Sequence, residues 1–169
     1  SFVQTPEDLE GIEHMRSICK VVEYEKLYFD GAKTQILQDA ICELFSRAPL
    51  PVVKYRTAGM RAKMRKLMQT HQYDLVHLDM LHLADYMDLC GNTPVALIEH
   101  NVEHVILDRR ADNETRPLHR AYLRYQAAKL KSYEGRACQR AQHVVAVSEL
   151  DAQQLRDLGP GARVTSVPN

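Results

Sequence analysis

The segment "ALIEHNVEH", residues 96–104, passes abruptly from apolar to titratable side chains. The apolar run at residues 95–98 is typical of a strand that is buried on both faces of a sheet. Four polar residues follow it closely: Glu99, His100, Asn101 and Glu103. They could be catalytic or binding groups at the edge of a sheet, ligands of a metal ion, or the start of the next helix.

Apolar segments of this kind alternate with amphipathic ones along the chain. Strands are expected at residues 18–24, 52–55, 73–79, 95–98, 143–148 and 163–167. Helices are expected directly after Thr5 and at residues 35–45, 60–68, 80–87, 118–141 and 149–158. This alternation predicts an α/β fold, in which a parallel sheet carries helices on both faces.

Polar residues also stand where other expected strands end. Parallel sheets bind their ligands at the carboxyl ends of the strands. Asp79, the cluster at residues 99–103, Ser148 and Asn169 should therefore lie along one edge of the sheet. This edge is the predicted functional surface.

Structural roles explain some of these residues without any chemistry. Asn101 is a good N-cap for a helix that begins at Val102, and Glu103 suits the first turn of that helix. Ser148 and Asp151 have the spacing of a helix cap. Glu99 and His100 have no such explanation, and a histidine pKa lies close to working pH.

The histidines also raise the question of a metal site. Five potential ligands lie close in sequence, namely His77, Asp79, His82, His100 and His104, but the chain lacks an H-E-x-x-H motif. G-x-S-x-G, Walker and G-x-G-x-x-G motifs are also absent, so the sequence indicates neither a serine nucleophile nor a phosphate-binding loop. We expect no metal and no cofactor.

Composition excludes several classes of partner. The 169 residues include 22 basic and 22 acidic side chains, so no net charge favours nucleic acid. Four well-separated cysteines indicate reduced, buried thiols in a cytoplasmic protein. The helix near residues 58–67 carries four cations, so it either docks on the sheet or touches an anionic membrane surface peripherally; these are Arg61, Lys63, Arg65 and Lys66.

Both ends of the sequence predict truncated elements. "SFV" resembles the end of a strand, and Thr5-Pro6-Glu7-Asp8 then starts a helix. "RVTSVPN" is a strand that stops at a turn. We therefore expect residues 1–169 to form a single domain that is truncated at both ends.

Four segments together carry a family resemblance: "YDLVHLD…LADYM", "PVALIEHNVEHVILDRR", "KSYEGRACQRAQHVVAVSELDAQQL" and "RVTSVPN". From about residue 50 to residue 169, the chain resembles the amino-terminal domain of retaining family-four glycosyltransferases. Their GT-B architecture places two Rossmann-like domains across a cleft. The resemblance implies metal-independent transfer of a sugar, with retention, from a nucleotide-sugar donor to a polysaccharide, lipid-linked or small-molecule acceptor.

The resemblance also implies roles for individual residues. His100 corresponds to the catalytic residue that faces the donor sugar. Substrate-binding roles follow for the neighbouring positions Glu99, Asn101, Glu103, Ser148 and Glu149. In the family a second domain binds the nucleotide sugar, so this chain alone should be inactive. The family's first strand lies in the middle of the sheet, so the resemblance also implies that the sheet lacks or borrows a central strand and can self-associate through an exposed edge. The alternative is a non-catalytic Rossmann-like module that binds a ligand or a partner at the same edge.

Overall fold

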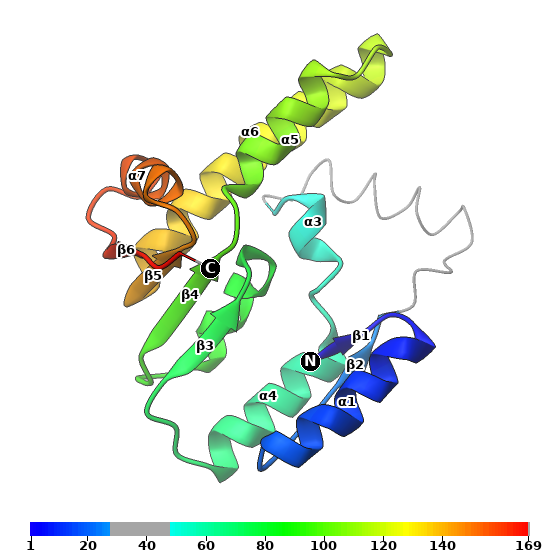
Figure 1. The fold of residues 1–169 in the computed structure, drawn as a ribbon, viewed down its shortest axis with the longest axis vertical. Coiled ribbons are helices and arrows are strands. Elements are labelled where there is room, and N and C mark those ends of the chain that lie inside the picture. Colours follow the sequence, from blue (N-terminus) through cyan, green and yellow to red (C-terminus); the bar gives the residue numbers. More distant parts are fainter. Residues whose placement is uncertain (28–47, 169) are drawn as a thin grey trace.

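A computed structural model describes residues 1–27 and 48–168 of the protein (Figure 1). The expected helix at residues 35–45, Cys42 and Asn169 lie outside the described residues. The described chain has an α/β architecture built from parallel strands and helices, which confirms the predicted fold class.

The strands form two parallel sheets. Strands β1 (Phe2–Val3) and β2 (Glu25–Lys26) form a short pair. The larger sheet has the order β3-β4-β5-β6. Its strands are β3 (Val76–Asp79), β4 (Val95–Glu99), β5 (His143–Ala146) and β6 (Val164–Ser166).

No described strand joins the two sheets into one ladder. The expectation that a central strand is missing or borrowed stays a prediction. Truncation of the domain at its ends stays a prediction.

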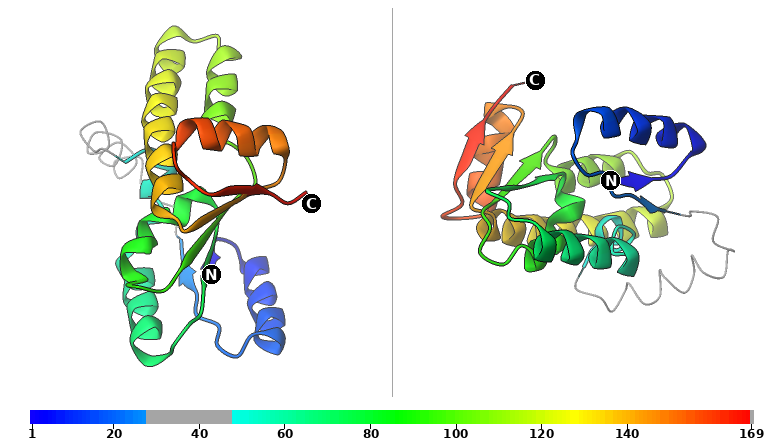
Figure 2. Two further views of the ribbon diagram at one scale, coloured as in Figure 1. Left: turned by 90° about the vertical axis from the view of Figure 1, so that its left-hand side faces the viewer. Right: turned by 90° about the horizontal axis from the view of Figure 1, so that it is seen from below.

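Helices lie on both sides of the strands. They are α1 (Pro6–Ile18), α3 (Leu50–Val53), α4 (Ala58–Thr70), η1 (Leu81–Leu89), α5 (Glu103–Asp112), α6 (Pro117–Arg140) and α7 (Glu149–Leu158). The connections β3–β4, β4–β5 and β5–β6 all advance in one direction, so right-handed crossovers place η1, α6 and α7 on one face of the sheet. In Figure 2 (right), α1 lies on the opposite side of the β1–β2 pair from α4.

The core lies between the larger sheet and these helices. Strand β4 alternates between buried and half-buried positions, and Val95, Leu97 and Glu99 point to the buried side. The expected apolar stripe of α6 is confirmed, because all its members are buried: Leu123, Ala127, Leu130, Tyr133, Ala137 and Ala141. Helices α6 and α7 approach closely at Gly135, where an added Cβ would lie 2.7 Å from the carbonyl oxygen of Leu158.

Two of the three predicted helix caps are present in the structure. Thr5 and Asp8 form a complete capping box at the start of α1, where Pro6 is the first helical residue. The Ser148 hydroxyl accepts a hydrogen bond from the Asp151 amide at 3.1 Å and caps α7.

Two predicted strands are wrong. Helix α1 continues to Ile18. Residues 19–24 have no partner strand in the described chain, because β1 pairs with Glu25 and Lys26, which follow them. Residues 50–53 form helix α3 instead of a strand. The β-branched pair Val52-Val53 suggested a strand, whereas Pro49 at the cap and Pro51 in the first turn favour a helix start.

Two further expectations need correction in detail. The helix after β3 is a 3₁₀ helix, η1, and not an α-helix. Among the described cysteines, Cys90 and Cys138 are buried free thiols as expected, whereas Cys19 is exposed.

Candidate functional site

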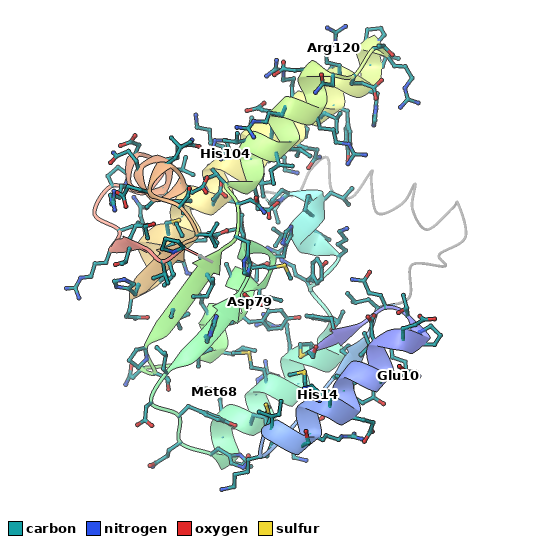
Figure 3. The ribbon with its side chains drawn as sticks, viewed as in Figure 1. Glu10, His14, Met68, Asp79, His104 and Arg120 are labelled. Atoms are coloured by element: carbon teal, nitrogen blue, oxygen red, sulfur yellow. The ribbon has the colours of Figure 1, made fainter. Side chains whose placement is uncertain are left out.

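The predicted residues gather at the carboxyl edge of the larger sheet. Strands β3, β4 and β5 are parallel and in register, with Asp79 opposite Ile98 and Glu99 opposite Ala146. The residues that directly follow these strands therefore emerge at the same edge. Figure 3 labels Asp79 at the end of β3 and His104 near the start of α5.

His100 and Asp79 form the exposed centre of this edge. The Nε2 atom of His100 lies 2.7 Å from Oδ1 of Asp79, and the two side chains are 43% and 64% exposed. The Asp79 carboxylate holds one nitrogen of the imidazole ring. No described residue hydrogen-bonds the other nitrogen, Nδ1, so it is available to a hydroxyl or phosphate of a ligand.

The backbone is strained next to this pair. Met80 has φ 123° and ψ 148°, a conformation that is nearly restricted to glycine. Such strain costs about 1–3 kcal/mol and concentrates at functional sites. Met80 directly follows Asp79, so the strained residue sets the direction in which the chain leaves the edge. The sequence contains no signal for it, because methionine does not favour this region.

Glu99 lies beneath the edge instead of on it. Its side chain is 1% exposed, and Oε1 has no hydrogen-bond partner among the described residues. Burial, with additional repulsion from Glu134 and Glu103, raises the pKa of Glu99 well above its ordinary value. The substrate-binding role expected for Glu99 stays a prediction, and in this conformation other residues cover the carboxyl group.

The predicted N-cap role of Asn101 is wrong. Val102 occupies the cap position of α5, and it makes no side-chain cap hydrogen bond. The fully buried Glu134 of α6 takes over this function, since its Oε1 accepts from the Glu103 amide at 2.8 Å. Its Oε2 lies 2.5 Å from Nδ1 of His104.

Sequence reasoning missed Glu134, although a signal was present. The residue lies four positions after Leu130 and three before Ala137, on the apolar stripe of α6. A charged residue is almost never fully buried unless it is paired. Glu134 is buried on that stripe and has two partners, so it belongs to the site.

The remaining predicted residues lie around His100 or at the end of β5. Asn101 is exposed, and Glu103 is half-buried. Burial and the Glu134 carboxylate raise the pKa of Glu103, whereas His100 opposes this shift. Ser148 is half-buried in its cap, and exposed Glu149 forms a 2.8 Å ion pair with Arg156. Their substrate-binding roles stay predictions.

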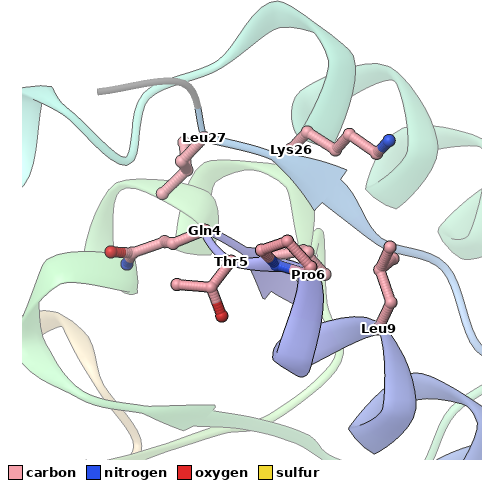
Figure 4. A pocket seen from close by; sticks show the side chains of 7 residues that line it. Gln4, Thr5, Pro6, Leu9, Lys26 and Leu27 are labelled. Atoms are coloured by element: carbon pink, nitrogen blue, oxygen red, sulfur yellow. The ribbon is translucent and has the colours of Figure 1, made fainter. Parts of the chain in front are cut away.

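A pocket of ≈ 180 Å³ lies at the carboxyl ends of the smaller strand pair (Figure 4). It is lined by the last residue of each strand, by the residues that follow β1 and β2, and by the first turn of α1; these include Thr5, Lys26 and Leu27. None of the residues predicted for the site lines it.

Among residues 1–27 and 48–168, no group of three or more histidine, cysteine, aspartate or glutamate residues is arranged to hold a metal ion. No helix in the same ranges has the length and apolar character needed to cross a bilayer.

Comparison with known proteins assigns the chain to a family. A search of curated proteins and a search of solved structures each returned no match. The model of Glycosyltransferase Family 4 matches residues 31–169, which include β3 to β6 and every residue predicted for the site. The chain, with its parallel sheet and the histidine at its carboxyl edge, therefore belongs to glycosyltransferase family 4.

Proposed function

We propose that this chain is the amino-terminal, acceptor-side half of a GT-B enzyme that transfers a sugar from a nucleotide-sugar donor with retention of configuration. The observation that carries the proposal is the exposed His100–Asp79 pair at the carboxyl edge of a family-four domain. The donor nucleotide would bind mainly to a second domain, so residues 1–169 alone would not turn over substrate.

The proposed chemistry matches what the edge offers. The donor diphosphate leaves as an anion, and the sugar passes through a cation-like state. Catalysis of this kind consists mostly of positioning and charge stabilisation. His100, oriented by Asp79, would hydrogen-bond the donor sugar or its phosphate, while exposed Asn101 and half-buried Glu103 would line the cleft beside it.

The class of acceptor is the least specific part of this proposal, and it is linked to where the enzyme acts in the cell. We propose a cytoplasmic enzyme that acts on a polysaccharide, lipid-linked or small-molecule acceptor. In α4, Arg61 pairs with Asp88 at 2.7 Å, and Lys63 pairs with Glu25. Arg65 and Lys66 are exposed. A docked helix with weak electrostatic contact to a membrane fits these pairings better than firm membrane attachment.

Substitution of His100 in the full-length protein tests the proposal. Nucleotide release and sugar transfer would be followed over a panel of uridine and guanosine diphosphate sugars, with and without EDTA. His100→Ala should lower turnover by about 10²–10³-fold, because it removes hydrogen bonds made in the transition state. The free energy of unfolding should change by less than about 1 kcal/mol, because the side chain is partly exposed.

A matched control uses a histidine at the opposite edge. His143 begins β5, and its Nε2 lies 2.8 Å from the Thr165 hydroxyl. His143→Ala should leave turnover unchanged. Full activity in His100→Ala would remove the proposed catalytic role, and an inverted anomeric product would contradict retention.

A further inference from the structure

We propose that Glu134 is a positioning residue for His100, because its buried carboxylate fixes the turn between β4 and α5 from which His100 projects. The link to sugar transfer rests on the proposed function. The fixing of the turn does not, since it follows from contacts within the described chain.

Each oxygen of the Glu134 carboxylate has a hydrogen-bond partner. Its side chain is fully buried in the middle of α6. One carboxylate oxygen accepts from the Glu103 amide at 2.8 Å, and the other lies 2.5 Å from Nδ1 of His104. A buried charge is stable only when such partners satisfy it, so two consecutive residues of α5 are held to one point of α6.

The turn that contains His100 lies between two fixed points. On one side, Glu99 is the last residue of β4 and lies opposite Ala146 in the ladder to β5. On the other side, Glu103 is fixed to Glu134. Only residues 100–102 remain between these points, and Val102 is itself buried. Few backbone conformations can close so short a turn.

Glu134 also does what a residue before α5 would normally do. The first amides of a helix lack partners within the helix, and an anion is favourable at this end. Val102 at the cap position has no side-chain oxygen to offer. If Glu134 were apolar, the Glu103 amide would lose its acceptor, and the turn would gain freedom at His100.

The hydrogen-bond geometry defines a rescue variant. Glu134→Leu removes both acceptors. Glu134→Gln keeps one oxygen for the Glu103 amide, and its NH₂ group can donate to Nδ1 of His104 if that ring shifts its proton to Nε2. His104 also lines a surface pocket with Lys131 and Asp157.

A spectroscopic experiment tests the turn directly. Amide hydrogen exchange at Glu103 and the ring signals of His100 and His104 would be measured by NMR in the full-length protein. In Glu134→Leu, exchange at Glu103 should rise by roughly 10–100-fold, the loss of one hydrogen bond to a charged group, and the His100 ring signals should shift. In Glu134→Gln, exchange should stay slow while His104 Nδ1 loses its proton.

The matched control is another buried polar residue on the same helix. Gln126 is buried in α6, and its Oε1 accepts from the Leu50 amide at 3.2 Å. Gln126→Leu should leave the signals of Glu103 and His100 unchanged. Unchanged exchange at Glu103 in Glu134→Leu would overturn the proposal. If that variant does not fold, an unchanged His104 tautomer in Glu134→Gln would overturn it equally.

Kinetics separate positioning from a purely structural role. Misplacing a reacting group by about 1 Å can lower a rate by about 10²-fold, so Glu134→Leu should lower kcat by about 10–100-fold with KM for the donor nearly unchanged. Glu134→Gln should retain most of the activity. Unchanged kcat together with altered Glu103 exchange would overturn the positioning role. A wild-type protein that transfers no sugar would refute the proposed function, while the NMR comparison would still decide whether Glu134 fixes the turn.

Discussion

Replacing Gly135 with alanine sets two opposing effects against each other. Gly135 lies inside α6, where alanine is favoured over glycine by about 1 kcal/mol because it restricts the unfolded chain and suits the helix. However, the new Cβ would lie 2.7 Å from the Leu158 carbonyl oxygen and 3.4 Å from its Cγ. The oxygen belongs to the backbone at the end of α7, so it cannot move without shifting that helix.

The clash should outweigh the gain in helix propensity. Overpacking of this kind costs about 1–3 kcal/mol, and the upper part of this range applies to a clash with backbone. Subtraction of the propensity gain leaves a net destabilisation of about 1–2 kcal/mol. For a protein of this size, the expected fall in Tm is about 2–8 °C.

Gly11 provides the matched control. It lies inside α1, and a Cβ added there would have no neighbour within 4 Å. Gly11→Ala should therefore raise the free energy of unfolding by about 0.5–1 kcal/mol. Thermal unfolding by circular dichroism and urea titration would measure both variants. If Gly135→Ala raises Tm as Gly11→Ala does, the close α6–α7 approach at Gly135 is wrong.

Three further predictions follow from the edge of the sheet and from α4. The folded-state pKa of Glu99 is raised, so the stability linked to its proton is present below the unfolded pKa and is lost as pH rises through the folded pKa. Glu99→Gln should therefore stabilise the protein at pH 8 and have little effect near pH 4; urea titrations showing a pH-independent difference would contradict this. Met80→Gly should be more stable than Met80→Ala by about 1 kcal/mol or more, because only glycine relieves the strained backbone; equal stabilities would argue against the strain. The protein should co-sediment weakly with anionic vesicles at low salt and not at all above physiological salt. Of the four α4 cations, only Arg65 and Lys66 lack a described ion pair, and each contributes about 1 kcal/mol to binding at an anionic surface. Salt-independent sedimentation would point to an apolar contact instead.

The sequence predicted the larger sheet well because its strands are defined locally. Residues 95–98 and 143–148 are apolar runs with polar ends, and the structure has β4 and β5 there. Ser148 and Asp151 similarly define the start of α7 within four residues. The short elements failed because neighbouring parts of the chain determine them. Residues 19–24 look like a strand but have no partner strand among the described residues, and Val52-Val53 is helical because it follows Pro49 and Pro51.

In the candidate site, too, the features that depend on local sequence were predicted, and those that depend on distant residues were not. That His100 follows a strand could be read from sequence, and so could the shared edge with Asp79 and Ser148. The buried contacts that support this edge could not be predicted from the sequence. Glu99 is buried although it ends a strand, and the cap of α5 comes from Glu134, which lies 31 residues from Glu103 along the chain.

The residues that face a ligand at the edge of the sheet are distinct from the buried residues that support it. The exposed His100–Asp79 pair joins β3 to β4, while the buried Glu134 contacts join α5 to α6. The exposed pair can contact a ligand, whereas the contacts of Glu134 hold the backbone from which His100 projects. Substitutions at Asn101 or Asp79 should therefore change what the edge binds with little loss of stability, because both side chains are exposed. A substitution at Glu134 acts on the turn itself, so it should lower turnover to a similar degree with every donor that meets His100.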